Sequence, residues 1–243
     1  MLFRSPFLGG NKVGFVTTVG NSTTIHNVGM SITATGAPTA VVVARTTLST
    51  LLRRMEWAVP TAAATAVAGF RSGSSVQFYL GRAADQLAGF HMVTRFGRGR
   101  GAAANATLRG FTGMTSILTA PTDTQASTLI ADAIGVGCDA GDTNYQIMHR
   151  TGTGAMTKVD TGIAKSVADF AEMYEIALFA PPGVDNSVFY RFTRLNDGLS
   201  FEGQITTNLP AFGTALAPYG YYSVGGTSSV LGYVVSTIYM ETD

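Results

Sequence analysis

Short apolar runs separated by turn-forming residues recur along most of the chain, and they set the expected architecture. From Val67 onward the runs return about every ten to fifteen residues, without amphipathic helical stretches between them. About a dozen such runs predict an all-β protein, an antiparallel β-sandwich of jelly-roll type, rather than alternating strands and helices. The runs expected to form strands are Val67–Arg71, Val76–Leu80, Gly89–Phe96, Leu108–Thr115, Ile134–Cys138, Tyr145–His149, Thr157–Thr161, Met173–Ala180, Val188–Leu195, Phe201–Thr207, Tyr219–Val224 and Leu231–Met240.

The alternation within these runs separates the two faces of each expected strand. Every second residue from Phe90 to Phe96 belongs to one face, and His91, Val93 and Arg95 belong to the other. Val188–Leu195 carries aromatic residues on both faces, and Glu175–Ala180 is apolar almost throughout, so the latter is expected to be a central strand. A strand that is apolar on both faces lies between two packed layers or between its sheet and a neighbouring subunit, and both arrangements remain open.

Residues 1–44 are expected to form an extended N-terminal arm, followed by a sandwich domain over residues 45–243. Glycine residues interrupt each apolar run of this first segment, so by itself it buries too little apolar surface to offset the entropy of ordering. Such an arm would serve attachment and assembly by lying on other chains. The alternative is a first hairpin of the main domain, from Val13–Val19 to Ile25–Val28.

One short helix is expected at the start of the sandwich domain, from Thr46 to Met55. Leu48, Leu51, Leu52 and Met55 would share one face of this helix, and Thr46 or Thr47 would cap it. The next residues, Glu56–Val59, are expected to be extended up to Pro60, before an Ala/Thr-rich connector or weak strand at 61–68. A single further helical turn is expected within Asp123–Asp132, and Trp57 is expected to anchor the core.

The stretch Ala133–Val159 predicts three neighbouring antiparallel strands joined by tight turns. In the first turn, Asp139, Asp142 and Asn144 offer three oxygen ligands of the kind that Ca²⁺ prefers. The spacing departs from the twelve-residue calcium loop and no bidentate Glu follows. The favoured interpretation is a turn whose side chains bond the local backbone, so that no metal and no other cofactor is expected.

The same stretch carries a resemblance to a known class of proteins. Gly137–His149, read together with Ala155–Gly162 and the closing Ile238–Asp243, resembles virion structural proteins of tailed bacteriophages, and in particular the C-terminal modules of tail fibres. The resemblance extends from about Leu51 to the end of the chain and includes no catalytic motif. It implies a lectin-like sandwich, a homotrimer, and a place in the virion after synthesis in the host cytoplasm.

The composition restricts the partners of the chain. Only 13% of the 243 residues are charged, well below the usual ~25%. No apolar run is long enough for a membrane span, so membrane insertion is not expected even though the mean hydropathy is +0.22. So neutral a surface is typical of a subunit in an obligate assembly, and a homo-oligomer is expected. The net charge of +1 provides no field for nucleic acid, and the single cysteine, Cys138, forms no intrachain disulfide.

No constellation of residues predicts catalysis. The histidines form no metal-ligand pair, Cys138 has the flanks of a strand end, and no Gly-x-Ser-x-Gly elbow is present. Glu172 and Glu175 are three residues apart, so on a strand they would point to opposite faces and could not cleave a glycoside together. The chain is therefore not expected to be an enzyme. The histidines are His26, His91 and His149, and the glutamates are Glu56, Glu172, Glu175, Glu202 and Glu241.

Two further groups of residues are candidates for binding. The first is basic, and its expected setting is a flexible loop between two strands in which the charges are solvated, with phosphate contact as the alternative. The second is aromatic, and it either forms a rigid surface for sugar or protein or lines the core. The basic residues are Arg95, Arg98 and Arg100, and the aromatic residues are Tyr219, Tyr221 and Tyr222.

Three functions compete at this point. The favoured one is a fibre or appendage subunit that recognises a host-surface glycan and is held to other virion proteins by the arm at residues 1–44. The second is a purely structural head-fibre or decoration (cement) protein, since 243 residues is short for a fibre and contains no heptads or shaft repeats. The third is a fibre tip that degrades polysaccharide. The sequence assigns no catalytic, cofactor-binding or metal-binding residue, and it leaves the binding residues unknown.

Overall fold

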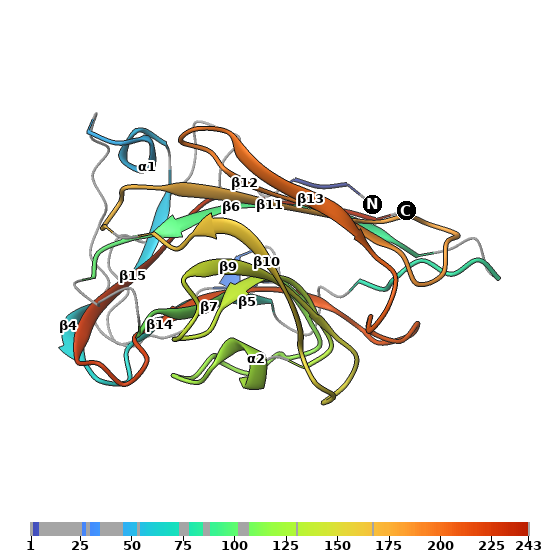
Figure 1. The fold of residues 1–243 in the computed structure, drawn as a ribbon, viewed down its shortest axis with the longest axis horizontal. Helices are drawn as coiled ribbons and strands as arrows, with labels where there is room; N and C mark the ends of the chain where they lie inside the picture. The colour runs from blue at the N-terminus through green and yellow to red at the C-terminus, as the bar shows by residue number, and fades with distance from the viewer. Residues whose placement is uncertain are drawn as a thin grey trace.

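The protein is a two-layered antiparallel β-sandwich (Figure 1). The computed structural model describes residues 2–4, 26–27, 30–34, 46–52, 54–72, 78–84, 88–101, 107–129, 131–166 and 168–242. The strands are β1 (Leu2–Arg4), β2 (His26–Asn27), β3 (Met30–Ala34), β4 (Met55–Ala63), β5 (Val67–Ser72), β6 (Phe90–Arg98), β7 (Arg109–Thr115), β8 (Ala133–Cys138), β9 (Asn144–Arg150), β10 (Thr157–Ala164), β11 (Met173–Ala180), β12 (Val188–Arg194), β13 (Leu199–Ile205), β14 (Ala217–Ser223) and β15 (Ser229–Glu241), and the helices are α1 (Leu48–Leu51) and α2 (Ala126–Leu129).

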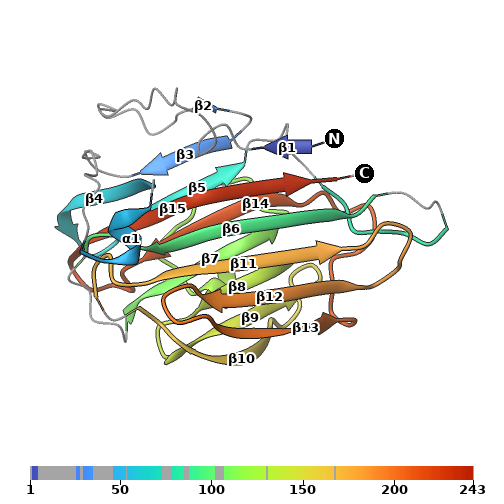
Figure 2. The ribbon, with the colours of Figure 1, turned by 90° about the horizontal axis from the view of Figure 1, so that it is seen from above.

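The strands form two sheets. Sheet A has the order β1-β15-β6-β11-β12-β13, and β4 pairs with the same edge of the long strand β15 as β1. Sheet B has the order β10-β9-β8-β7-β14-β5-β3-β2. Figure 2 looks onto sheet A and shows both labelled chain ends at the same end of the sandwich. The all-β prediction is confirmed, as is the expected meander, because β8, β9 and β10 are neighbours in sheet B.

The core between the sheets is rich in aromatic rings. Phe96 lies at its centre, with ring centroids 5.9 to 6.4 Å from those of Tyr174, Tyr222 and Tyr233, among others. Burial of such a side chain contributes about 1.5–3 kcal/mol, so these rings account for much of the stability of the sandwich. Trp57 joins this core at 5% exposure and stacks on Tyr233, as expected.

The phenol groups of the core are satisfied within it. The hydroxyl of Tyr145 lies 2.6 Å from that of Tyr222, and the hydroxyl of Tyr233 lies 2.8 Å from Thr112 Oγ1. The second pair links the two sheets, because Thr112 belongs to β7 and Tyr233 to β15. A buried hydroxyl without a partner would be costly, so the Thr112–Tyr233 pair also helps to fix how the two sheets face each other.

The prediction of a helix over Thr46–Met55 is right in place and wrong in length. Thr47 caps α1, and a capping box links its side chain and backbone to Thr50. The helix ends at Leu51, whose side chain is 51% exposed, while Ser49 and Thr50 are buried. The Thr50 hydroxyl donates to Thr47 O inside the turn and the Thr47 hydroxyl donates to Phe170 O, so the polar face of the helix packs inward and the expected leucine face does not form.

Strand β4 is longer than expected and runs through Pro60 to Ala63. Proline has no N–H to donate, so within a sheet it is tolerated where the hydrogen-bond ladder is interrupted or where the strand lies at the sheet edge. Both conditions hold here: among the strands that the structure describes, β4 pairs with β15 alone, and the register shifts between the pairs Leu231–Val59 and Ser229–Ala63.

The remaining expectations have mixed outcomes. β11 lies between β6 and β12, as expected of a central strand, and α2 supplies the helical turn expected in Asp123–Asp132. Instead of a strand at Val76–Leu80, the structure has a single bridge from Phe78 to Leu216, and residues 73–77 lie outside the described part. The alternative hairpin lies outside the described residues except at β2. Strands β1 and β3 pair with β15 and β5, and the division of the chain at residue 44 stays a prediction.

Candidate functional site

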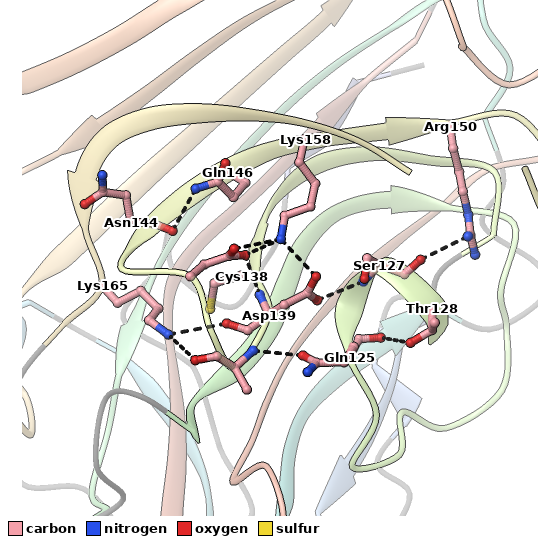
Figure 3. Close-up of polar contacts among 12 residues, drawn as sticks. Gln125, Ser127, Thr128, Cys138, Asp139, Asn144, Gln146, Arg150, Lys158 and Lys165 are labelled. Carbon is pink, nitrogen blue, oxygen red and sulfur yellow. Dashed lines mark hydrogen bonds and ion pairs between the residues drawn. The ribbon is translucent and has the colours of Figure 1, made fainter. Parts of the chain in front are cut away.

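The turn between β8 and β9 is held by a lysine side chain from β10. Asp139 and Asp142 bond each other's backbone, as expected for a tight Asx turn, with Asp139 N 2.8 Å from Asp142 Oδ2. The Lys158 ammonium donates to Asp139 Oδ2 at 2.9 Å and to both carboxylate oxygens of Asp142 at 2.8 and 2.6 Å (Figure 3). We call Asp139–Asn144 with Lys158 and Lys165 the lysine-bridged turn.

A second ammonium group lies beneath the same turn. Lys165 is 2% exposed and donates to the carbonyl oxygens of Leu108, Asp139 and Ala140 at 3.3 to 3.4 Å. Burial lowers the pKa of Lys165, and this main-chain cage of oxygens compensates for part of the lost hydration. The two positive charges that bind the oxygen atoms of this turn are therefore the ammonium groups of Lys158 and Lys165.

The structure separates the three oxygen ligands that suggested Ca²⁺. The carboxylates of Asp139 and Asp142 converge on Lys158, whereas the side chain of Asn144 donates to Asp160 Oδ1 at 3.0 Å. Burial alone would raise the pKa of Asp139, but hydrogen bonds from Ser127 and the Lys158 ammonium outweigh it and lower this pKa. The turn interpretation is therefore the one the geometry supports. Within the described ranges, no group of three or more His, Cys, Asp or Glu side chains is placed to hold a metal ion.

The outer face of sheet B is covered by a segment that we call the strap, residues 116–129, which includes α2. Arg71, Arg109 and Arg150 rise from three different strands, and each donates to a strap carbonyl: Leu118, Asp123 and Ser127 respectively. A small apolar cluster that includes Phe111, Ala126 and Met148 lies between the strap and the sheet. In Figure 1, α2 lies on the far side of sheet B from sheet A.

The strap explains why the tyrosines of β14 do not form a binding surface. Tyr219 and Tyr221 are 0% exposed, and their hydroxyls donate to the strap carbonyls of Thr119 and Thr124. Tyr222 points to the other face of the strand and is 1% exposed in the main core. Of the two sequence interpretations, the core one is correct, although Tyr219 and Tyr221 line a second apolar cluster beneath the strap.

The prediction of a loop with solvated arginines is wrong. Strand β6 runs on to Arg98, and each of the three arginines is paired with a carboxylate: Arg95 with Glu175 at 2.7 Å, Arg98 with Asp169 at 3.4 Å, and Arg100 with Glu56 at 3.1 Å. Arg98 is only 2% exposed. Because each of these guanidinium groups is paired with a carboxylate, the three arginines link strands and loops of the sandwich and do not form an open phosphate-binding site.

The described glutamates are dispersed. Glu172 accepts a hydrogen bond from the hydroxyl of Tyr174, whose ring is in the core, and Glu175 binds Arg95 on the outer face of sheet A. They therefore point to opposite sides of sheet A, as the spacing predicted. Glu56 is buried against Arg100, Glu241 accepts from Tyr239, and Glu202 is exposed on β13.

The remaining candidates for chemistry are held in structural roles. Burial raises the pKa of Cys138 to about 12, so it is a protonated thiol at neutral pH, and it contacts Leu108 O. Burial lowers the pKa of His149, whose Nδ1 lies 3.3 Å from Asn208 O. His91 lies between the rings of Phe179 and Tyr239, and the side chain of His26 lies outside the description.

A surface that the sequence analysis did not single out lies at the end of the sandwich where Figure 2 shows the labelled chain ends. Three loops meet there: residues 78–84, 181–187 and 206–216. Phe78 and Leu216 exchange backbone hydrogen bonds of 2.7 and 2.8 Å, and Ala83 N donates to Asp185 Oδ1 at 3.0 Å. A Cβ on Gly81 would lie 2.0 Å from Pro181 O, so only glycine allows the first two loops to approach so closely.

Large apolar side chains stand exposed on these loops. Tyr79 is 40% exposed, Val184 42% and Phe212 45%, and the Arg82 guanidinium lies 4.6 Å from the centroid of the Phe212 ring. Asp185 adds an exposed carboxylate. We call Tyr79, Arg82, Val184, Asp185 and Phe212 the loop-end cluster. The sequence indicated this cluster only weakly. Its residues follow no strand or helix periodicity, and each stands out only as a large or charged side chain within a turn-rich segment.

Comparison with known proteins supports the fold assignment. No family model and no curated protein sequence matches the chain. Among solved structures, lectin II from Ulex europaeus has 12% identity over 89% of this chain and 93% of its own, with a TM-score of 0.51. The Lotus tetragonolobus seed lectin has 8% identity over 90% of this chain and 95% of its own, also with a TM-score of 0.51.

A more distant similarity is to the CBM2 module of the evolved Dit of Lactobacillus casei BL23 phage J-1. It has 10% identity over 71% of this chain and 67% of its own, with a TM-score of 0.40. The comparison rests on the Ulex and Lotus lectins, and at 8–12% identity their similarity to this chain shows the fold alone. The chain is a lectin-like β-sandwich of the jelly-roll class.

Proposed function

We propose that this chain is a glycan-recognition subunit of a phage virion, displayed on a fibre or appendage, and that the loop-end cluster is its sugar-binding surface. The lectin-like fold supports the glycan part of the proposal. The resemblance of Gly137–His149 and the chain end to tail-fibre modules supports the virion part.

The observation that carries the proposal is that three adjoining loops carry exposed aromatic and polar side chains, with the Arg82 guanidinium over the Phe212 ring. A sugar ring presents an apolar C–H face, which packs on aromatic rings such as Tyr79 and Phe212. Its hydroxyl groups need donors and acceptors at the rim, which Arg82 and Asp185 offer. The opposite charges of these two side chains suit a neutral glycan better than a strongly acidic one.

The affinity of such a surface is expected to be modest. Two exposed rings and a few polar groups would bind one sugar unit with a dissociation constant on the order of 1 mM, about 4 kcal/mol. Tight attachment to a cell would then depend on several copies engaging at once. This is consistent with a subunit that acts as part of an assembly.

The test is retention of host-surface polysaccharide by the recombinant chain and by variants. Replacement of Tyr79 and Phe212 together by Ala is expected to weaken binding at least tenfold, with the melting temperature unchanged. Leu199→Ala is the matched control, since Leu199 is 45% exposed, as Phe212 is, but lies on β13 outside the cluster. Equal binding by the double variant and the wild type would refute the site.

A purely structural decoration role is the rival function, and the observation that favours it is an exposed aromatic row on sheet A, described below. Polysaccharide cleavage has less support, because Glu56, Glu172 and Glu175 each bind a separate partner: Arg100, Tyr174 and Arg95 respectively. Wild-type chain that binds no host polysaccharide but is required for particle stability would favour the decoration role.

We also propose that the N-terminal arm fastens the subunit to other virion proteins. Deletion of residues 1–44 would be a poor test, because it removes β1 and β3, which pair with β15 and β5. Deletion of residues 6–24 keeps both strands. Particles assembled with this shorter chain should lack the subunit while the isolated protein remains folded, and normal incorporation would contradict the proposal.

A further inference from the structure

The outer face of sheet A carries four aromatic side chains in a row across four adjacent strands. Tyr239 of β15, His91 of β6, Phe179 of β11 and Phe189 of β12 follow one another with ring centroids 5.7, 6.1 and 6.4 Å apart. The pairing registers explain the alignment, since Phe179 is directly opposite both His91 and Phe189. We call these four residues the aromatic row. This face of sheet A is turned toward the viewer in Figure 2.

The aromatic row is incompletely buried. Phe179 is 43% and Phe189 44% exposed, whereas Phe96 and Phe192 on the inner face of the same sheet are 1% and 0% exposed. Two large rings held side by side at a sheet surface leave apolar area in contact with water, which is unfavourable unless another surface covers it. The rings on either side of His91 meet it edge to face, at 74° and 87°, so the row does not form a flat platform for a sugar ring.

Charged residues next to the row are arranged in pairs. Glu175 lies between Arg95, at 2.7 Å, and Arg191, at 3.9 Å, and Arg191 is opposite Glu202 in the β12–β13 ladder. Among the side chains that the structure describes, this face holds two arginines and three glutamates, with Glu241 at its edge, so their charges nearly balance. A nearly neutral face does not repel an identical face, and it offers no attraction to a strongly basic or acidic partner.

The size of the face suits association between two copies. Five strands about 4.8 Å apart and about seven residues long, at about 3.4 Å per residue, give roughly 24 by 24 Å, or about 575 Å² per copy. Two copies would bury about 1,150 Å² if the face is treated as flat, just above the ~1,000 Å² expected of a specific interface. Few of the residues of this chain are charged, which is consistent with such a covered face.

We propose that the outer face of sheet A is the surface through which two copies of this chain pack, with Phe179 and Phe189 at the centre of the contact. Two identical faces packed together define a two-fold axis, so the assembly is a dimer or an even multiple of it. The phage resemblance instead implies a trimer, and in a trimer this face would have to meet a different surface of the neighbour. The inference is independent of the sugar site, because the loop-end cluster shares no residue with the aromatic row.

The test is sedimentation equilibrium of the full chain and of Phe179→Thr/Phe189→Thr, in which β-branched residues keep the strands. The wild type should be dimeric at micromolar concentration, and the double variant should dissociate at least 100-fold more readily while keeping its melting temperature at low concentration. Leu199→Thr, equally exposed at 45% but at the start of β13, should leave the dimer intact.

Three results would overturn the proposal. The first is a monomeric wild type at 100 μM or so, an association far weaker than a specific interface provides. The second is a trimer, or any oligomer, that persists in the double variant. The third is a monomeric wild type whose polysaccharide binding is lost in the double variant, which would make the aromatic row a sugar site. Weakened binding to a multivalent surface, with unchanged affinity for a short oligosaccharide, is the expected consequence of lost avidity and supports the proposal.

Discussion

Replacement of Lys158 by Met tests the structural role of the lysine-bridged turn. Methionine keeps the length and apolar stem of the side chain but removes the ammonium that binds Asp139 and Asp142 through three carboxylate oxygens. The two carboxylates then lie close together without a counter-charge. We expect a stable but weakened fold, because the backbone bonds of the turn remain.

The magnitude follows from the burial of the three side chains. Lys158 is 27% exposed, Asp139 14% and Asp142 19%, so the cluster is neither at the surface nor fully buried. Exposed pairs contribute about 0–1 kcal/mol and the breaking of a buried pair costs about 3–5 kcal/mol, which places this loss at about 2 kcal/mol. For a chain of this size the melting temperature should fall by about 4–8 °C.

The pH dependence has a defined sign. The pKa of Asp139 is lowered in the folded state, so its contribution is present above its ordinary value of 3.8 and is lost as the pH falls through the folded pKa. Burial lowers the pKa of Lys158, but its bonds to Asp142 and Asp139 outweigh this and raise it, so its contribution is lost only as the pH rises above 10.5. The variant should therefore differ most from the wild type between about pH 4 and 10.

The assay is thermal unfolding by circular dichroism at pH 7, with Arg194→Met as the control. Arg194 binds only Asp197 on the surface, 2.5 Å away, and this exposed pair should contribute little. Addition of Asp142→Asn to the Lys158 variant should restore part of the loss, and a chelator should leave the wild-type melting temperature unchanged. A Lys158 variant no less stable than the Arg194 variant, or a wild type destabilised by the chelator, would refute the reasoning.

Further predictions concern the packing of the sandwich and its response to acid. Gly135→Ala should cost about 1–3 kcal/mol or more, since a Cβ would lie 2.5 Å from a neighbouring strand's carbonyl, whereas Gly141→Ala, with nothing within 4 Å, should be neutral in urea denaturation. Tyr222→Phe should lower the free energy of unfolding by about 1–3 kcal/mol, because it leaves the Tyr145 hydroxyl unpaired. In the same assay, the Tyr145→Phe/Tyr222→Phe double variant should lose less than twice the free energy that Tyr222→Phe loses. The pKa of His149 is lowered by burial, so stability should fall as the pH drops below 6.5, and His149→Gln should flatten this slope in thermal melts; an unchanged slope would contradict it.

The strands were predictable because their signal is local. Alternation within Phe90–Arg98 and the punctuation around Met173–Ala180 follow from the pleat of a strand and from the conformations open to Gly and Pro. The same local chemistry identified Thr47 as a cap. It failed at Pro60, because the tolerance of β4 for proline depends on its edge position in sheet A, which no local pattern encodes.

The candidate sites were less predictable because they depend on contacts between distant segments. Tyr219 and Tyr221 alternate as surface tyrosines would, and only the position of the strap shows that they are buried. The partners of Arg95, Arg98 and Arg100 lie 80, 71 and 44 residues away along the chain, so the three arginines looked unpaired in the sequence. The loop-end cluster likewise assembles only when three separate loops meet.

Hydrogen exchange with and without bound host-surface polysaccharide tests the glycan-recognition claim most directly. Under saturating polysaccharide, the amides of residues 78–84, 181–187 and 206–216 should exchange more slowly, because the ligand would cover the loops that carry Tyr79, Val184 and Phe212. Exchange at the lysine-bridged turn should be unchanged. Protection confined to that turn or to the outer face of sheet A, with the three loops unaffected, would contradict the account.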